Sequence, residues 1–374
     1  MNRRPIILAA GGTGGHMFPA EALARELLTR GWQVALVTDR RGEAFGDRVA
    51  GVTLHRIRAG RLGEGVVAKM AAVADMALGT LAAGRLLRAL APAAIVGFGG
   101  YPSVPTMLSA SRLGIASVLH EQNAILGRAN RLLAARVGTI ATSFPGMRAN
   151  TRARIVEVGN PVRPEIAALR HAAYTPPGPE GPIQILVIGG SQGARILSAV
   201  VPAALALLDP ALRKRLQVVQ QARSEDLAEV RRSYQASGIA AETATFFDDI
   251  PLRLQRAQIV VSRAGASTVA ELTTIGRPAI LVPYRYAVDD HQTANARALE
   301  GAGAAWMFGE GGFTPERIAA ALTSLLATPD ALSHAAAASH RLGRPDAAGH
   351  LADLAVIAAG GSNGHAPIQG EHAA

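Results

Sequence analysis

Two glycine-rich turns, about half a chain length apart, limit what this chain can fold into more than any other feature of the sequence. The first turn, residues 11–15, lies between the apolar run 6–10 and a helical pattern over residues 20–28. The second turn, residues 189–193, lies in the same way between an apolar run and a helical pattern. Each segment predicts a strand, a tight turn and a helix, which together direct unpaired backbone N–H groups and a helix dipole at a bound anion.

The repetition of this unit predicts two α/β domains, each beginning with its own glycine turn. Short apolar runs alternate with helical patterns in both halves, as is typical of doubly wound parallel sheets with right-handed crossovers. We expect two Rossmann-like domains, residues 1–160 and 161–358, with a ligand in the cleft between their sheets. The prolines Pro161 and Pro164 mark the boundary, and the polar, glycine-rich end 359–374 is expected to be disordered.

The composition excludes several classes of function. The chain of 374 residues contains no cysteine, so disulfides, thiolate metal sites and a cysteine nucleophile are excluded. We expect no signal peptide before the first strand. The sequence contains no run of about 18 uncharged apolar residues, so we expect no membrane span. The net charge of +10 suits nucleic acid, an anionic membrane or a phosphorylated substrate. Nucleic acid is not an expected partner, because no basic and aromatic binding pattern accompanies the charge.

The glycine spacing argues against two common nucleotide-binding loops. The dinucleotide fingerprint fails because Met17 occupies its third glycine position in the first turn, and because Gln192 stands two residues after Gly190 in the second. A P-loop needs a lysine directly after a glycine, and neither Lys69 nor Lys214 has one before it. A diphosphate held by helix N-termini and arginine requires no metal, so we expect neither a metal nor another cofactor.

Residues 263–271 form the most specific local pattern of the second half. A strand ends there, Gly265 turns the chain, Ser267 or Thr268 can cap, and a helix begins. The helix N-terminus can hold a phosphate, and Glu271, about one turn in, can accept hydrogen bonds from both ribose hydroxyls. An ordinary capped helix with a surface glutamate has the same spacing, so the pattern by itself leaves both interpretations open.

Seven segments, taken together and in this order, resemble a known family, the two-domain GT-B glycosyltransferases, and within it the peptidoglycan N-acetylglucosaminyltransferases. The segments are residues 11–19, 97–102, 120–123, 159–163, 189–195, 263–271 and 290–296. Any one of them is a weak signal, but the ordered set is specific and covers most of the chain.

The resemblance implies an inverting transfer of N-acetylglucosamine from UDP-N-acetylglucosamine to the 4-hydroxyl of lipid I, undecaprenyl-diphospho-muramoyl pentapeptide. The product is lipid II, used for peptidoglycan synthesis. The enzyme is expected peripherally on the cytoplasmic face of the bacterial inner membrane, with the acceptor on the first domain and the donor on the second. Another GT-B lipid glycosyltransferase or a UDP-sugar epimerase stays open as an alternative. A basic nucleic-acid-binding protein would explain the charge but not the two glycine turns.

In the first half of the chain, the resemblance implies a site for the donor diphosphate and the acceptor. Thr13, Gly14 and Gly15 line that part of the cleft, and Asn123 contacts the transferred sugar.

In the second half, the resemblance implies a site for the donor nucleotide. Arg163 and Ser191 meet the nucleotide and its phosphates, Phe247 presents its backbone to the uracil, and Gln292 binds the sugar hydroxyls. The start of one helix wraps the phosphates and the ribose, with the glutamate on the ribose: Ala266, Ser267, Thr268, Val269, Ala270 and Glu271.

Two residues compete for the role of general base. His16 is the expected base, because an imidazole at the lip of the first turn can exchange a proton near neutral pH. Glu121 is the alternative base. His16 could instead hydrogen-bond the diphosphate or cap the turn, and Glu121 could instead fix the loop that follows its strand.

Residues 66–90 predict a long helix that could rest on a membrane surface. Apolar residues recur near helical spacing at Val67, Met70, Val73, Ala74, Leu78 and Leu81. Basic residues flank them at Arg61, Lys69, Arg85 and Arg88. An apolar face ringed by cations suits an anionic bilayer, whereas the same pattern also fits a helix packed on its own sheet.

Overall fold

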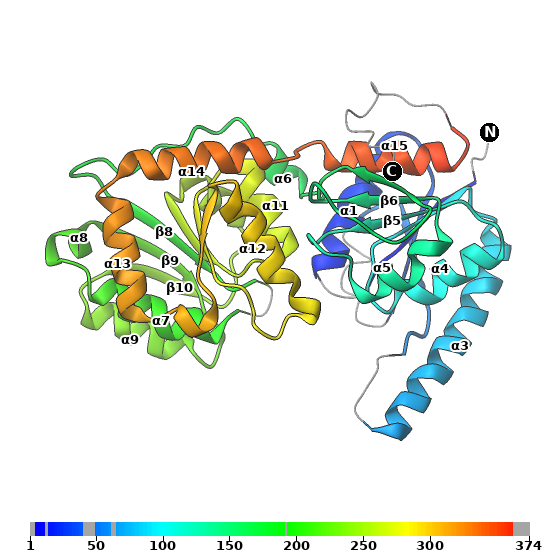
Figure 1. The fold of residues 1–374 in the computed structure, drawn as a ribbon, viewed down its shortest axis with the longest axis horizontal. Coiled ribbons are helices and arrows are strands. Elements are labelled where there is room, and N and C mark those ends of the chain that lie inside the picture. The colour runs from blue at the N-terminus through cyan, green and yellow to red at the C-terminus, as the bar shows by residue number, and fades with distance from the viewer. Residues whose placement is uncertain (1–3, 12–13, 40–48, 61–64, 191–192, 362–374) are drawn as a thin grey trace. The chain divides into compact units, whose positions relative to one another are not determined.

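A computed structural model describes the chain apart from residues 1–3, 12–13, 40–48, 61–64, 191–192 and 362–374 and the side chains of residues 66–69. The chain divides into two compact units (Figure 1). Unit 1 comprises residues 1–163 and 344–374, and unit 2 comprises residues 164–343.

Unit 1 is built on a seven-stranded parallel sheet with the order β3-β2-β1-β4-β5-β6-β7. Its strands are β1 (Ile6–Ala9), β2 (Val34–Thr38), β3 (Val52–Arg56), β4 (Ala94–Gly97), β5 (Ser117–Glu121), β6 (Thr139–Thr142) and β7 (Arg154–Glu157). Its helices are α1 (Gly14–Thr29), α3 (Val66–Leu90), α4 (Ser103–Arg112), α5 (Arg128–Leu133), η2 (Ala134–Arg136) and α15 (Ala347–Ala358).

The central strand β1 carries apolar side chains on both faces, and each face is part of a separate core. Ile6 and Leu8 belong to the cluster that includes residues of α1 and α15. Ile7 and Ala9 belong to the cluster that includes residues of α3, α4 and α5. Because side chains alternate across a strand, a run without polar residues is what a strand covered by helices on both faces requires.

The last helix, α15, belongs to unit 1, which differs from the predicted boundary at residue 358. Leu351 and Leu354 are buried in the same cluster as Ile6 and Leu8. Arg30, directly after α1, also pairs with the buried carboxylate of Asp353 at 2.6 Å. An apolar helical pattern does not reveal which sheet the helix packs against. The sequence therefore could not predict that the chain returns to unit 1 after residue 343. The predicted disorder of residues 359–374 concerns mostly residues outside the described part.

Unit 2 is built on a six-stranded parallel sheet with the order β10-β9-β8-β11-β12-β13. Its strands are β8 (Ile183–Ile188), β9 (Leu216–Gln221), β10 (Ala240–Ala244), β11 (Ile259–Ser262), β12 (Ala279–Leu281) and β13 (Ala305–Met307). Its helices are α6 (Pro164–Ala167), α7 (Arg195–Ala206), α8 (Pro210–Arg215), α9 (Leu227–Ala236), α10 (Ile250–Arg256), α11 (Ala266–Ile275), η3 (Val288–Asp290), α12 (His291–Gly301), η4 (Glu310–Gly312), α13 (Pro315–Leu326) and α14 (Pro329–Leu342).

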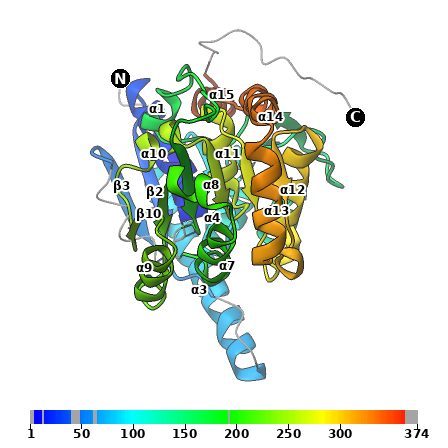
Figure 2. The ribbon, with the colours of Figure 1, turned by 90° about the vertical axis from the view of Figure 1, so that its left-hand side faces the viewer.

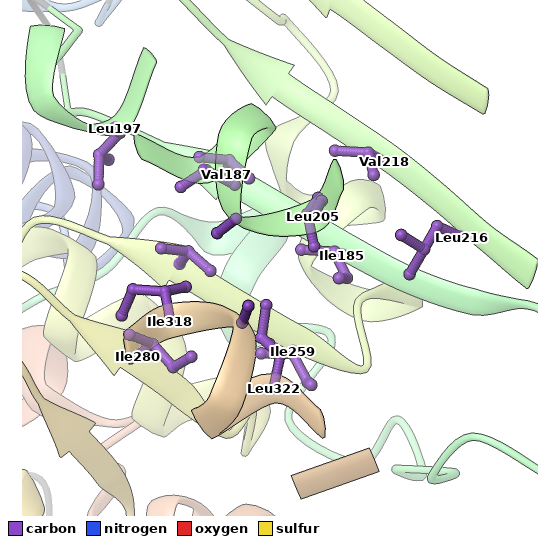
Figure 3. Close-up of a cluster of buried hydrophobic side chains, with 14 of the residues drawn as sticks. Ile185, Val187, Leu197, Leu205, Leu216, Val218, Ile259, Ile280, Ile318 and Leu322 are labelled. Atoms are coloured by element: carbon purple, nitrogen blue, oxygen red, sulfur yellow. The ribbon is translucent and has the colours of Figure 1, made fainter. Parts of the chain in front are cut away.

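The core of unit 2 forms where β8 packs against helices from both ends of the unit's sequence. Ile185 and Val187 of β8 lie in one buried cluster with Leu205 of α7 and with Ile318 and Leu322 of α13 (Figure 3). Residues far apart in the sequence therefore hold the first strand of this unit in the middle of its sheet.

Helix α3 extends beyond the other elements of unit 1 at its N-terminal end (Figure 1, Figure 2). This element confirms the predicted helix over residues 66–90. By length and composition, Met70–Leu90 is long and apolar enough to cross a membrane, and a third (33%) of its most apolar window is buried in the structure. The expectation of no membrane span rested on the absence of an uncharged apolar run, and Met70–Leu90 does contain the charged residues Asp75, Arg85 and Arg88. One such helix is weak evidence, because a buried core helix passes the same test.

Candidate active site

Both sheets reverse their strand order at one point, and the glycine turns lie there. In unit 1 the reversal falls between β1 and β4, and in unit 2 between β8 and β11. In open α/β sheets, ligands bind outside the carboxyl ends of the strands at such a switch point. The predicted segments at residues 11–16, 97–102, 189–195 and 263–271 directly follow or end these four strands. Each unit therefore presents one half-site at the position that its topology favours.

In unit 1, the backbone of two turns holds the ring of His16. A Cβ atom on Gly11 would lie 3.2 Å from His16 Cδ2. On Gly100, which has φ +73°, a Cβ atom would lie 3.2 Å from His16 Cδ2 and 3.3 Å from Nε2. The turn after β4 therefore needs glycine at position 100 both for its backbone conformation and for its approach to the imidazole.

A chain of hydrogen bonds leads from His16 into the interior of unit 1. His16 Nδ1 lies 3.2 Å from Gln122 Oε1. Gln122 Nε2 lies 3.1 Å from His120 Nδ1, and His120 Nε2 lies 2.9 Å from the carbonyl oxygen of Gly159. Burial lowers the pKa of His120 to about 4, so this imidazole is neutral at pH 7. The sequence interpretation included residues 120–123 as a motif but assigned no role to His120 or Gln122.

Glu121 accepts four hydrogen bonds, all from the segment that follows its strand. Its Oε1 accepts from Asn123 N at 3.0 Å and from Asn123 Nδ2 at 3.1 Å. Its Oε2 accepts from Gly127 N at 2.9 Å and from Asn130 Nδ2 at 2.8 Å. The carboxylate is buried, with 2% of the residue exposed. This geometry supports the loop-fixing interpretation of Glu121 over the catalytic one, because donors from the loop and from α5 already occupy both oxygens.

The other predicted residues of this half-site lie close to it, with one difference in assignment. Gly14 begins α1, where a Cβ atom would lie 3.0 Å from the ring of Phe18, whereas Gly15 has open space around that position. Arg163 was expected in the second domain, but it belongs to unit 1, where its guanidinium lies 5.8 Å from the Phe18 ring centre. The predicted Thr13 lies outside the described residues.

In unit 2, the N-terminus of α11 is not capped by a side chain. Gly265 is the N-cap residue with extended backbone angles, and no side-chain cap hydrogen bond is present. The expectation that Ser267 or Thr268 caps the helix is therefore wrong. The hydroxyl of Ser267 is buried without a hydrogen-bond partner among the described residues. A bound anion could satisfy both this hydroxyl and the first N–H groups of the helix.

Helix α12 and η4 hold the loops that surround this helix start. Asn295 Nδ2 donates to the carbonyl oxygen of Ala264 at 3.0 Å, and Gln292 Oε1 accepts from the backbone N–H of Tyr284 at 3.0 Å. Arg263 donates to the carbonyl oxygen of Val282 at 3.1 Å and pairs with Glu310 at 2.7 Å. Sequence reasoning missed Asn295 and Glu310, because their partners are distant in the chain.

The remaining donor-side residues are spread around the same sheet edge. Glu271 lies in the second turn of α11. Its side chain is half-buried, Thr268 and Ala270 are half-buried too, and Ala266 and Val269 are buried. Phe247 is buried after β10, and the guanidinium of Arg253 lies 4.1 Å from its ring centre. The predicted Ser191 lies outside the described residues. Among the residues that the structure describes, no group of three or more His, Asp and Glu side chains could hold a metal ion.

Family models match both halves of the chain. The Glycosyltransferase family 28 N-terminal domain matches residues 6–142, and the Glycosyltransferase family 28 C-terminal domain matches residues 184–351. A relative from Rhodospirillum centenum, named UDP-N-acetylglucosamine–N-acetylmuramyl-(pentapeptide) pyrophosphoryl-undecaprenol N-acetylglucosamine transferase, is 56% identical over 97% of this chain and 97% of its own.

Two solved structures resemble the chain over most of its length. The crystal structure of Acinetobacter baumannii MurG has 30% sequence identity and a TM-score of 0.78, and the match covers 94% of this chain and 99% of that one. A UDP-N-acetylglucosamine 2-epimerase has 13% identity and a TM-score of 0.65, covering 96% of this chain and 97% of its own, which indicates a shared fold only. The chain therefore belongs to glycosyltransferase family 28 and is a glycosyltransferase with the GT-B fold of two Rossmann-like domains.

Proposed function

We propose that the chain transfers N-acetylglucosamine from UDP-N-acetylglucosamine to the 4-hydroxyl of the muramoyl sugar of lipid I, which produces lipid II. The observation that carries this proposal is the 56% identity, over 97% of both chains, to a transferase whose name states this reaction. The positions of the two half-sites support it, because each lies at the switch point of its sheet.

The proposed mechanism is a direct displacement at the anomeric carbon. A bond forms between this carbon and the acceptor oxygen, while the bond to the β-phosphate oxygen of UDP breaks and inverts the configuration. His16 accepts the hydroxyl proton. The free N–H groups of α11 and the hydroxyl of Ser267 are suited to the negative charge that develops on the leaving diphosphate. Glu271, one turn further along α11, is suited to the ribose hydroxyls.

The test is transfer of labelled N-acetylglucosamine from its UDP donor to a short-chain analogue of lipid I, with EDTA present. Labelled lipid product is the expected result. If product forms only after magnesium is restored, the proposed transfer reaction stands, but the expectation that it needs no metal ion is contradicted. Absence of product under both conditions, with the protein folded and the donor bound, would contradict the proposed acceptor. Epimerised UDP-sugar without an acceptor would favour the epimerase alternative.

We further propose that one face of α3 rests on the cytoplasmic surface of the inner membrane, where lipid I is held. Met70, Val73, Leu78 and Leu81 are 68%, 66%, 50% and 60% exposed. Their spacing places them on one side of the helix, and Arg85 and Arg88 continue that exposed side for two more turns. Ala83 and Leu87 are buried on the other side, in the cluster that includes α4. The apolar stripe with arginines at one end suits anionic headgroups.

Replacing one leucine of this face tests the membrane proposal. Leu78→Glu is expected to weaken binding to phosphatidylglycerol vesicles at least tenfold, because a carboxylate would enter the apolar interface next to anionic headgroups. Leu207→Glu is the matched control, since Leu207 is 57% exposed at the end of α7 in unit 2. Vesicle sedimentation measures both variants. Equal binding of Leu78→Glu and the unchanged protein would exclude this face as the contact.

A further inference from the structure

The proton on the neutral ring of His16 can be located from its neighbours. A neutral imidazole carries one N–H and one lone pair, and the hydrogen bond that one nitrogen makes decides where the proton is. This choice separates two of the roles that the sequence leaves open for His16, general base and donor to the diphosphate. A general base needs a lone pair on Nε2, whereas a neutral His16 that donates to a diphosphate through Nε2 needs the proton there.

The orientation of the Gln122 amide is determined by atoms that can only accept. Gln122 Nε2 lies 3.0 Å from the carbonyl oxygen of Phe98 and 3.1 Å from the carbonyl oxygen of His120. Carbonyl oxygens cannot donate, so the amide NH₂ group must face them. The amide oxygen Oε1 then faces His16 Nδ1 at 3.2 Å. Because this oxygen also only accepts, His16 Nδ1 must carry the proton.

The buried imidazole of His120 requires the same arrangement. Its Nε2 lies 2.9 Å from the carbonyl oxygen of Gly159, so Nε2 donates and Nδ1 holds the lone pair. That lone pair lies 3.1 Å from Gln122 Nε2, a donor. Residue 120 is completely buried, and burial disfavours its cationic form, in which an N–H would face the NH₂ group of Gln122. One placement of the protons is therefore consistent at both ends: His120 Nε2–H faces the Gly159 carbonyl oxygen and His16 Nδ1–H faces Gln122 Oε1. Between them, the two hydrogens of the Gln122 NH₂ group are shared among the carbonyl oxygens of Phe98 and His120 and the lone pair of His120 Nδ1.

We propose that Gln122 is a positioning residue that holds neutral His16 as the Nδ1–H tautomer and leaves the lone pair on Nε2. The backbone carbonyls of Phe98 and His120, together with the buried His120 ring, orient Gln122 for this task. The statement that Nε2 receives the proton of the acceptor hydroxyl rests on the proposed function. The tautomer itself depends only on the contacts within unit 1.

The test combines ring nitrogen NMR with two matched variants of the full chain. The ¹⁵N shifts of labelled histidine distinguish a protonated ring nitrogen from one with a lone pair, and His16→Gln identifies the signals of residue 16. Gln122→Met and Gln122→Glu both remove the amide NH₂ group. Only Gln122→Glu keeps an oxygen opposite His16 Nδ1, so the tautomer of His16 in the two variants reports on that contact.

In the unchanged protein, His16 is expected as the Nδ1–H tautomer. Gln122→Met should show increased Nε2–H tautomer and lower kcat by about 10- to 100-fold, with KM for UDP-N-acetylglucosamine within about twofold. Gln122→Glu should retain more of the Nδ1–H tautomer than Gln122→Met, although its second oxygen faces the carbonyl oxygens of Phe98 and His120 and so lowers kcat as well. A predominant Nε2–H tautomer in the unchanged protein would overturn the proposal, as would a Gln122→Met protein that keeps both the Nδ1–H tautomer and kcat. The NMR result stands without activity, so a protein that fails to form lipid II contradicts the proposed function and not the tautomer.

Discussion

At the scale of single residues, Gly100 links the backbone of unit 1 to its chemistry. Its φ of +73° is rare for other residues, and a Cβ atom at this position would lie 3.2 Å from His16 Cδ2. Gly100→Ala is expected to lower the free energy of unfolding by about 1 kcal/mol and kcat at least tenfold, because the new methyl group would displace the imidazole. Gly114→Ala is the control, with φ +66° and nothing within 4 Å of the added carbon. Chemical unfolding and steady-state kinetics measure both; similar kcat values in the two variants would contradict the proposed displacement of His16.

His120 predicts a pH dependence of stability at the same scale. Its folded pKa of about 4 lies below the ordinary value of 6.5, so the unfolded chain binds a proton first as the pH falls. The contribution of neutral His120 to the free energy of unfolding is complete above pH 6.5. As the pH falls toward 4 this contribution is lost, which lowers the free energy of unfolding by about 3 kcal/mol. His120→Phe keeps a ring beside Phe98 and should remove this part of the pH dependence in urea unfolding between pH 7 and 4. An unchanged slope in the variant would show that other groups cause the acid sensitivity.

At the scale of secondary-structure elements, Arg277 joins the ends of two helices in unit 2. Its buried guanidinium donates to the carbonyl oxygens of Leu254 and Gln255 in α10 at 2.9 and 2.8 Å, and it also lies near those of Ile275 and Gly276 at the end of α11. Arg277→Met should destabilise unit 2 by about 3 kcal/mol, because these carbonyls lose their donor inside the protein. Hydrogen exchange of unit 2 measures the loss.

The exposed Arg256 on α10 provides the control for this element. Arg256→Met should change the stability of unit 2 by less than about 0.5 kcal/mol, since it removes only a surface charge. Equal effects of the two substitutions would mean that charge, and not the hydrogen bonds to the helix ends, accounts for the contribution of Arg277.

At the scale of the whole molecule, the chain leaves unit 1 at residue 163 and returns to it at residue 344. Unit 2 is therefore one continuous segment with its own core, and residues 164–343 expressed alone are expected to fold and to bind UDP. Circular dichroism and calorimetry measure these properties. A chain that ends at residue 343 should instead lose the stability of unit 1, because α15 no longer covers Ile6 and Leu8. Retained protection of β1 against hydrogen exchange in that shorter chain would contradict the role assigned to α15.

The sequence by itself determined the two α/β domains, the strands before the two glycine turns and the order of the functional segments, because those features depend on local patterns. The apolar runs before each glycine turn specify buried parallel strands, and the turns that follow must then lie at the carboxyl ends of these strands. The long helix over residues 66–90 follows from local pattern in the same way.

Only the tertiary structure decided which residues meet. Four donors from the loop after β5 and from α5 surround Glu121, Gln122 bridges two histidines, and α15 returns to the first sheet. Gly265 is the N-cap of α11, and no side chain caps this helix, although the sequence pattern offered Ser267 and Thr268 for that role. Such contacts join residues through space, and their geometry depends on the packing of whole elements, which no spacing along the chain records.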